Sequence, residues 1–417
     1  MYWFQMSDQA PIVVVSARQP AAFSEALAAS HTFPLIDASW DDALDAVARV
    51  QPAAVLVSAT AADMPIFQTL AKRLGAKQPY VPLIAVDPIT PLPGNAIPFA
   101  ATAGNFDRLT ARLRNALRVR TLHATVMRRL TAENVLRTSL HTPDPIEDAT
   151  VMLIGRGAGY PALSVAFGER VGVVGALSIE AAAKHLNNRD LDGIVISEGF
   201  SARVVDAFLT VLAEDARFRN LPVVVTTPGL VPTYDLANLE MSAGDAAAIA
   251  ATALPLVRQH AFEARLSRAL KSIDSDGLLD ANTGLLTRAA FERDLATAVY
   301  QTQSRGGGLS AARFAFDAIP ERAQLDAARI LSRLMRQMDF GTLQSDGSIV
   351  VVFAETDLRN AHMIAKRLSS VMKHTMHGPK RDARNDPQVT VATLLPGDTA
   401  KSILARLQEN VARRAAS

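Results

Sequence analysis

The chain has 417 residues, 49% of them hydrophobic, which is enough for about three domains of roughly 150 residues each. Its formal net charge is +2 and it has no long basic run, so nucleic acid is not expected as a partner. The sequence contains no cysteine, which excludes disulfides, thiolate metal sites and thiol nucleophiles.

Targeting signals are not evident in the sequence. No apolar stretch reaches the ~18 residues that a membrane helix needs. The first residues, MYWFQMSDQAPIVVV, do not place a basic region before a cleavable apolar core. We therefore expect a cytoplasmic protein with no membrane span.

Residues 1–120 alternate short apolar runs with helical patterns. Strand-like runs occur at 10–16, 33–37, 53–58 and 80–88, and helical patterns occur at 21–30 and 41–50. Strands that alternate with helices predict a parallel sheet covered on both faces. A long amphipathic, arginine-rich pattern follows at 105–140, and we assign residues 121–145 to a helical linker.

The same alternation restarts after HTPDPIED, a break rich in proline and acidic residues. Strand-like runs occur at 149–155, 170–177, 191–197 and 221–227, with helical patterns at 178–186 and 204–218. Residues 146–258 therefore look like a distant internal repeat of the first domain. A second linker helix is expected at 259–278.

Residues 279–417 show a different mixture. A turn-rich entry leads into a helix, and later helical patterns at 323–338 and 357–374 separate strand-like runs at 309–316, 348–353 and 387–395. Long helices with few strands predict an α+β domain. The predicted fold is thus α/β multidomain, with two doubly wound parallel sheets followed by an α+β domain.

Two stretches, LDGIVIS at 191–197 and AEDARFRNLPVVVTTPG at 213–229, resemble a two-component receiver domain. In that family an aspartate that accepts a phosphoryl group ends the third strand, an acidic pair that binds Mg²⁺ follows the first strand, and a lysine follows the fifth. The resemblance places Ser197 and Ser58 at the two acceptor positions. The first strands of the two repeats end in SAR and GRG, without acids, and neither repeat shows a convincing lysine.

Phosphoryl transfer to a receiver requires a carboxylate nucleophile and a metal ion that neutralises developing charge. A serine without neighbouring acids supplies neither of these. Both receiver-like domains are therefore expected to be inert to phosphorylation and to act as dimerisation and docking scaffolds. A phosphoserine switch is the alternative.

The stretch DANTGLLTRAAF at 280–291 resembles the DxLTGLxNRRxF entry of the GGDEF diguanylate cyclase family. The matching residues are Asp280, Thr283, Gly284, Leu285, Arg288 and Phe291, whereas Asn282 and Thr287 depart from the pattern. Together with the receiver-like repeats, the resemblance covers nearly the whole chain. It points to tandem-receiver GGDEF proteins of the PleD type and the non-catalytic PopA type.

The turn that gives the GGDEF family its name is degenerate in this chain. In ungapped register it reads Ser345, Asp346, Gly347, Ser348 and Ile349. The two glycines that let the backbone approach a nucleotide are replaced, and so is the acidic pair. The metal-binding stretch upstream is shortened and leaves Asp317, and a single carboxylate cannot hold two metal ions. We expect no enzyme activity, no metal and no catalytic cofactor.

An RxxD motif, Arg336-Gln337-Met338-Asp339, stands five residues before this turn. In the family, a motif at this spacing binds the product, cyclic di-GMP, together with an arginine of the next helix, here Arg367. Residues three apart on a helix share a face, so Arg336 and Asp339 at the end of the predicted helix would point together. Arginine can meet O6 and N7 of guanine, and a carboxylate can accept from N1–H and N2–H. The alternative is an ordinary surface ion pair.

The second receiver-like domain offers Arg156 and Arg170 as possible cross-domain contacts to the same ligand, as the resemblance implies. Solvated surface charges are the alternative for both residues.

Two functions follow. The first is a non-enzymatic cyclic di-GMP effector, which the PopA resemblance extends to a homodimeric adaptor at a cell pole. Its partners would be the adaptor RcdA, the ClpXP protease and the substrate CtrA, in cell-cycle-regulated proteolysis. The second is a ligand-independent scaffold for dimerisation and protein interaction. Residual cyclase activity is a third possibility.

Overall fold

The computed structural model describes residues 11–415 except 19, 30–32, 90, 102–105, 134–143, 228–229, 231–233, 306–307, 317–318, 337 and 376–385. The chain divides into two compact units. The first comprises Met1–Ile179 and Leu191–Leu266, and the second comprises Glu180–Asp190 and Ser267–Ser417.

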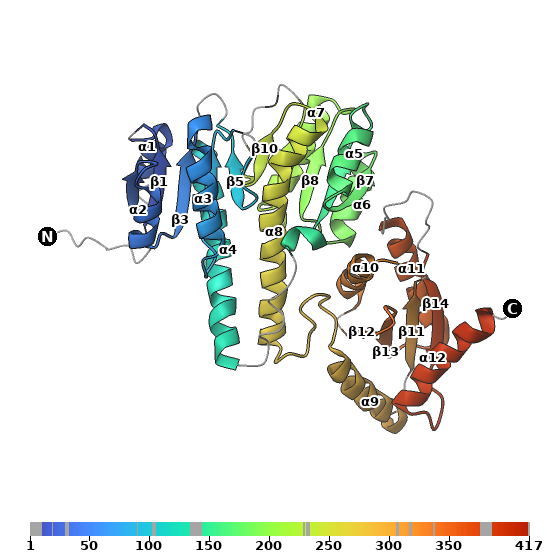
Figure 1. The fold of residues 1–417 in the computed structure, drawn as a ribbon. Coiled ribbons are helices and arrows are strands. Elements are labelled where there is room, and N and C mark those ends of the chain that lie inside the picture. The colour runs from blue at the N-terminus through green and yellow to red at the C-terminus, as the bar shows by residue number, and fades with distance from the viewer. Residues whose placement is uncertain are drawn as a thin grey trace. The chain divides into compact units, whose positions relative to one another are not determined.

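The first sheet is fully parallel and has the strand order β2-β1-β3-β4-β5 (Figure 1). Its strands are β1 (Ile12–Ser16), β2 (Leu35–Ala38), β3 (Ala54–Ser58), β4 (Leu83–Val86) and β5 (Ala96–Phe99). Its helices are α1 (Ala22–Ala29), α2 (Ala43–Val50), α3 (Met64–Gly75) and α4 (Asp107–Glu133), with a 3₁₀ turn, η1, at Ala61–Asp63. Val13 and Val15 pack on α2 and α3, whereas Ile12 and Val14 pack on α1 and α4. Because both faces are covered, the inner strands β1, β3 and β4 are apolar except for a serine at the ends of β1 and β3.

The second sheet repeats this architecture with the order β10-β9-β8-β6-β7, again all parallel. Its strands are β6 (Thr150–Ile154), β7 (Gly172–Ala176), β8 (Gly193–Ile196), β9 (Val223–Val225) and β10 (Leu239–Met241). The helices of this repeat are α5 (Tyr160–Gly168), α6 (Ile179–Asn188), α7 (Ala202–Glu214) and α8 (Ala246–Asp274), preceded by a 3₁₀ turn, η3, at Pro145–Asp148.

In strand numbers counted within each repeat, both sheets have the doubly wound order 2-1-3-4-5. The prediction of two doubly wound parallel sheets is confirmed. The fifth strands, β5 and β10, were not predicted from the sequence. Among the described residues, neither repeat has a helix between its fourth and fifth strands.

The two long helices α4 and α8 run beside each other beyond the sheets in Figure 1. Arg118 of α4 donates to Glu263 of α8 at 2.5 Å. The expected linker at 121–145 thus begins as an extension of α4, and the one at 259–278 is largely the end of α8. No helix within the described part of the chain is long and apolar enough to cross a membrane.

The third sheet, in the second unit, is antiparallel with the order β12-β13-β11-β14. Its strands are β11 (Leu309–Ala315), β12 (Phe340–Leu343), β13 (Ile349–Ala354) and β14 (Gln388–Thr393). Its helices are α9 (Arg288–Arg305), α10 (Glu321–Leu334), α11 (Leu358–Thr375) and α12 (Ala400–Ala415). Helices α10 and α11 pack on one face, and α9 and α12 on the other. From β11 to β14 the elements follow a ferredoxin-like βαββαβ order, which confirms an α+β domain.

Candidate functional site

Helix α10 ends at Leu334, so the prediction that it continues through the RxxD motif is wrong. Met335 is already extended, and the motif forms a turn in which the amide of Asp339 donates to the carbonyl of Arg336 at 3.0 Å. The chain must leave the helix here because β12 begins at Phe340 and pairs with β13. The five-residue spacing between motif and degenerate turn is therefore the length of strand β12 and one more residue.

Asp339 is only 8% exposed. Its Oδ1 accepts a hydrogen bond from the amide of Ala354, at the end of β13, with a distance of 3.3 Å. Burial raises the pKa of this carboxyl group, although backbone hydrogen bonds from Ala354 and Arg336 and the charge of Arg336 act in the opposite direction. Asp339 therefore anchors the turn to the sheet, whatever else it binds.

The two arginines of the predicted site are exposed. Arg336 lies in the turn, where its charge acts on Asp339, and it forms no ion pair within 4 Å with any described carboxylate. Arg367 lies on α11, whose buried side carries Ala361, Ala365 and Leu368, and it too has no partner in the described part of the chain. Both guanidinium groups are thus available to a ligand. No hydrogen bond or ion pair joins Arg367 to Arg336 or Asp339.

The degenerate turn connects β12 to β13 and is closed by a small polar network. Asp346 accepts from the amide and hydroxyl of Ser348, at 3.0 and 2.6 Å, and from Arg313 of β11 at 2.8 Å. Burial alone would raise the pKa of Asp346, but the hydrogen bonds from Ser348 and Arg313 lower it. Gly347 has a φ of 77°, which favours glycine. Arg313 could not be singled out from the sequence, because its contact with the turn depends on the pairing of β11 with β13.

Within the described ranges, no three acidic or histidine side chains are grouped closely enough to hold a metal ion. Asp317, the lone acid of the shortened metal stretch, lies outside the described residues. In the turn itself, Asp346 is neutralised by Arg313.

Ser58 and Ser197, the two residues that the sequence analysis assigned to acceptor positions, lie at the carboxyl ends of the third strand of each sheet. Ser58 is the last residue of β3, and its carbonyl accepts from the indole of Trp40 at 3.2 Å. Ser197 follows β8, is 1% exposed, and donates its amide to the carbonyl of Ile154 at 2.7 Å. Both strands lie in the middle of their sheets, beside the first strand of the repeat.

Arg156 and Arg170 lie at opposite ends of the second sheet. Arg156 follows β6 at the carboxyl edge, where its Nε donates to the carbonyl of Gly199 at 3.2 Å and its guanidinium covers Phe200. Arg170 precedes β7 at the amino edge. Strands β6 and β7 pair in parallel along their whole length, so the end of β6 and the start of β7 lie at opposite edges of the sheet. Arg156 and Arg170 therefore cannot contact the same ligand group.

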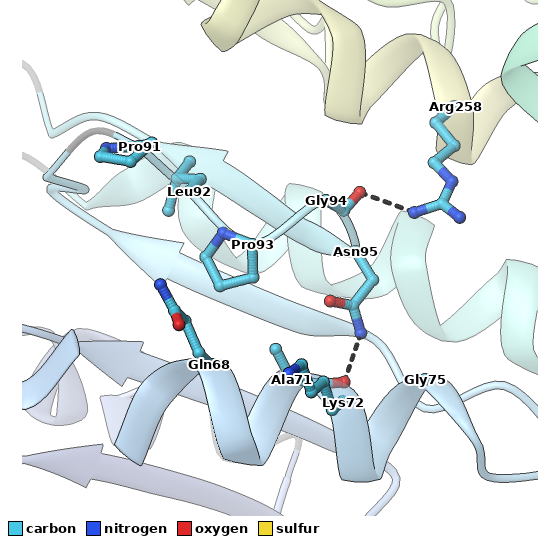
Figure 2. A pocket seen from close by; sticks show the side chains of 10 residues that line it. All are labelled: Gln68, Ala71, Lys72, Gly75, Pro91, Leu92, Pro93, Gly94, Asn95 and Arg258. Atoms are coloured by element: carbon cyan, nitrogen blue, oxygen red, sulfur yellow. Dashed lines mark hydrogen bonds between the residues drawn. The ribbon is translucent and has the colours of Figure 1, made fainter. Parts of the chain in front are cut away.

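A hollow of about 410 Å³ lies in the first unit, between α3 and the segment that replaces a helix before β5 (Figure 2). Asn95 donates to the carbonyl of Ala71 at 2.8 Å, and Arg258 donates to the carbonyl of Gly94 at 2.8 Å. The hollow is lined by Gln68, Ala71, Lys72, Gly75, Pro91, Leu92, Pro93, Gly94, Asn95 and Arg258. None of the residues singled out from the sequence contributes to it.

No model of a known protein family matches the chain, and no curated protein is significantly similar to it. Solved structures that resemble part of it include GGDEF domains. The coiled coil and GGDEF domain of DgcB from Caulobacter crescentus, in complex with c-di-GMP, is 18% identical, covers 36% of this chain and 88% of that chain, and has a TM-score of 0.29.

Two further solved structures come from Pseudomonas aeruginosa. The diguanylate cyclase SiaD, in complex with its activator SiaC, is 17% identical over 36% of this chain and 67% of that chain, with a TM-score of 0.31. The FimX GGDEF domain is 19% identical over 32% of this chain and 90% of that chain, with a TM-score of 0.28. At these identities and TM-scores the function has to be argued from the residues of the site.

Proposed function

We propose that the protein is a non-enzymatic cyclic di-GMP effector that binds its ligand through Arg336, Asp339 and Arg367. The observation that carries the proposal is the exposure of Arg336 beside a buried carboxylate, in a turn held in place by β12 and β13. An exposed guanidinium without an ion-pair partner can meet O6 and N7 of a guanine with two hydrogen bonds.

The three residues would have different roles. Arg336 reads the guanine edge. Asp339 holds the turn through Ala354, and a lone pair of its carboxylate can accept from guanine N1–H. Arg367, exposed on α11, would bind a phosphate or stack on the second base.

Cyclase activity is not part of the proposal. The turn lacks two glycines and its acidic pair, and Arg313 already pairs with the one acid that remains. The downstream role, recruitment of partner proteins such as RcdA, ClpXP and CtrA by a homodimer, rests on the family resemblance alone and stays a prediction.

Isothermal titration of the full chain with cyclic di-GMP tests the proposal. We expect saturable binding that Arg336→Ala weakens by at least about tenfold, since hydrogen bonds to a charged group are the strong ones. Arg293→Ala is the matched control, because Arg293 is an exposed arginine on α9, which covers the opposite face of the same sheet. Absence of binding by the unaltered chain would leave only the scaffold function.

Incubation with GTP and Mg²⁺ tests the second half of the proposal. We expect no cyclic di-GMP by chromatography under conditions in which an active cyclase forms it. Product formation that survives purification from contaminating cyclases would contradict the assignment as a non-enzyme.

A further inference from the structure

Strand β7 forms one edge of the second sheet and has β6 as its only neighbour in that sheet. The amide of Gly172 donates to the carbonyl of Ala149, just before β6, so Gly172 directs its backbone groups towards β6. Successive residues of a strand direct these groups to alternate sides, so those of Val173 and Gly175 point away from the sheet. Within the described ranges, the amides and carbonyls of Val173 and Gly175 have no hydrogen-bond partner.

The other edge strands in the described part of the chain are protected. Each carries an exposed charge or has an outward carbonyl that already accepts a hydrogen bond. They are β2 with the charge of Asp37, β5 with Pro98 bonded to Arg112, β10 with Leu239 bonded to Arg108, β12 with Gly341 bonded to Leu286, and β14 with Thr393 bonded to Arg406. Free strand edges are templates for pairing with another chain, and charges, proline or cover commonly block them. Strand β7, with the sequence GVVGA, has none of these.

The surroundings of this edge are apolar. Leu177 directly follows β7 and is 59% exposed. Helix α5 packs against β7 and has no charged residue, and its Val165 is 63% exposed. Exposed apolar side chains beside an unpaired strand edge are typical of a surface that another protein chain covers.

The strand that matches this edge best is β7 of a second copy, running antiparallel across a two-fold axis. With the axis at Val174, Val173 of each copy lies opposite Gly175 of the other, and the unpaired backbone groups of both residues face each other. Each such pair exchanges two hydrogen bonds. Gly172 lies opposite Ala176, so no two charged side chains oppose each other along the strand. An edge that is complementary to itself in this way forms a closed, isologous interface.

We propose that the protein forms a homodimer in which β7 pairs with β7 of a second copy and joins the two second sheets into one continuous sheet. The interface is short, so the dimer should dissociate on dilution. The pairing does not involve the proposed cyclic di-GMP site around Arg336, and the dimer should therefore form without that ligand.

Sedimentation of the full chain over a wide range of concentrations tests the proposal. We expect a monomer–dimer equilibrium that Val173→Pro weakens at least about tenfold, because each copy loses an outward amide while the hydrogen bonds to β6 remain. Leu35→Pro is the matched control. Leu35 is a half-buried residue of β2, the edge strand of the first sheet, and its amide also points outward, since the carbonyl of Pro34 faces β1.

A single introduced cysteine reports the register, because the chain has no cysteine of its own. Val174→Cys places two thiols opposite each other at the axis, in a pair without mutual hydrogen bonds, where Cα atoms are about 4.5 Å apart and a disulfide can form. We expect rapid crosslinking between two chains on mild oxidation. Ile36→Cys is the control, at a more exposed position on β2, and should crosslink more slowly although Val174 is only 2% exposed.

The proposal is overturned if the chain is monomeric at every concentration, if Val173→Pro and Leu35→Pro have the same effect on the dimer, or if Val174→Cys crosslinks no faster than Ile36→Cys. A monomer would leave the β7 edge to an extended segment of a different protein. Arg336→Ala should leave the dimer intact, and a failure of cyclic di-GMP to bind would not affect it, so the two proposals can fail separately.

Discussion

Nη2 of Arg112 lies 2.8 Å from Oε1 of Glu240, and both side chains are almost completely buried. Arg112 belongs to α4 of the first repeat, and Glu240 to β10, the edge strand of the second. The same guanidinium donates to the carbonyls of Pro98 and Ala237, at 2.5 and 2.7 Å, and lies over the ring of Phe99. One arginine thus joins the edge strands of two sheets within a single unit.

Removing one partner of this pair should destabilise the first unit strongly. Arg112→Met leaves the Glu240 carboxylate buried without its cation, at a cost of about 3–5 kcal/mol. Urea unfolding followed by circular dichroism measures the loss. Arg118→Met is the control, because the Arg118 side chain is 49% exposed in its ion pair with Glu263 and should cost less than about 1 kcal/mol. If both variants lose the same free energy of unfolding, the buried pair of Arg112 and Glu240 is not the main link between the two sheets.

The contrast between Glu240 and the other strand residues explains what the sequence could and could not predict. Strand β13 is apolar throughout and β1 is apolar up to its last residue, so their burial follows from composition. Strand β10 has three residues and a buried carboxylate at its centre. The sequence pattern of such a stretch predicts a loop, because the ion pair with Arg112 that allows its burial is not visible locally. The partner lies more than a hundred residues away, and no local pattern reports it.

The candidate site shows the same division. The position of the RxxD motif shortly before the degenerate turn could be read from the sequence, because only the short strand β12 and one more residue separate the two. The end of α10 could not, since no glycine, proline or capping residue follows Leu334. What ends the helix is a long-range contact, the hydrogen bond from Ala354 to Asp339 and the pairing of β12 with β13.

Gly347 should tolerate no side chain without loss of stability. Gly347→Ala places a Cβ in the left-handed region, which costs about 1–2 kcal/mol, and 2.6 Å from the amide carbon of Gln324, which must move. Gly397→Ala is a matched control, since Gly397 has a similar φ of 81° but open space around it. Thermal unfolding should show a larger loss for Gly347→Ala than for Gly397→Ala. A smaller loss would mean that the side chain of Gln324 does not hold the turn.

The stability of the first unit should fall in mildly acidic solution because of His123. Its Nδ1 accepts from the amide of Tyr80 at 3.0 Å, and its ring packs against Phe262. Burial lowers the pKa of His123 below 6.5, so the folded chain prefers the neutral ring. The stabilisation is present above pH 6.5 and is lost as the pH falls through the lowered pKa, by at most about 1.4 kcal/mol per pH unit for one proton.

Unfolding midpoints between pH 8 and pH 5 test this dependence. We expect His123→Gln to flatten the decline, because glutamine can accept the same hydrogen bond without titrating. His362→Gln, at an exposed position on α11, should leave the curve unchanged. A decline that persists in full in His123→Gln would assign the acid sensitivity to other groups.

Binding of cyclic di-GMP should weaken as the pH is lowered, because of Asp339. Burial raises the pKa of this carboxyl group, so it takes up a proton at a higher pH than an exposed aspartate would. A protonated carboxyl group is a weaker acceptor for N1–H of guanine than a carboxylate, because it has lost its negative charge, and the affinity should therefore fall as the pH approaches the raised pKa from above. Calorimetric titrations between pH 7.5 and pH 5 measure the change. In Asp339→Asn the affinity should be lower at neutral pH and nearly independent of pH. If the pH profile of this variant is the same as that of the unaltered chain, Asp339 has only its structural contact with Ala354, and the two arginines alone recognise guanine.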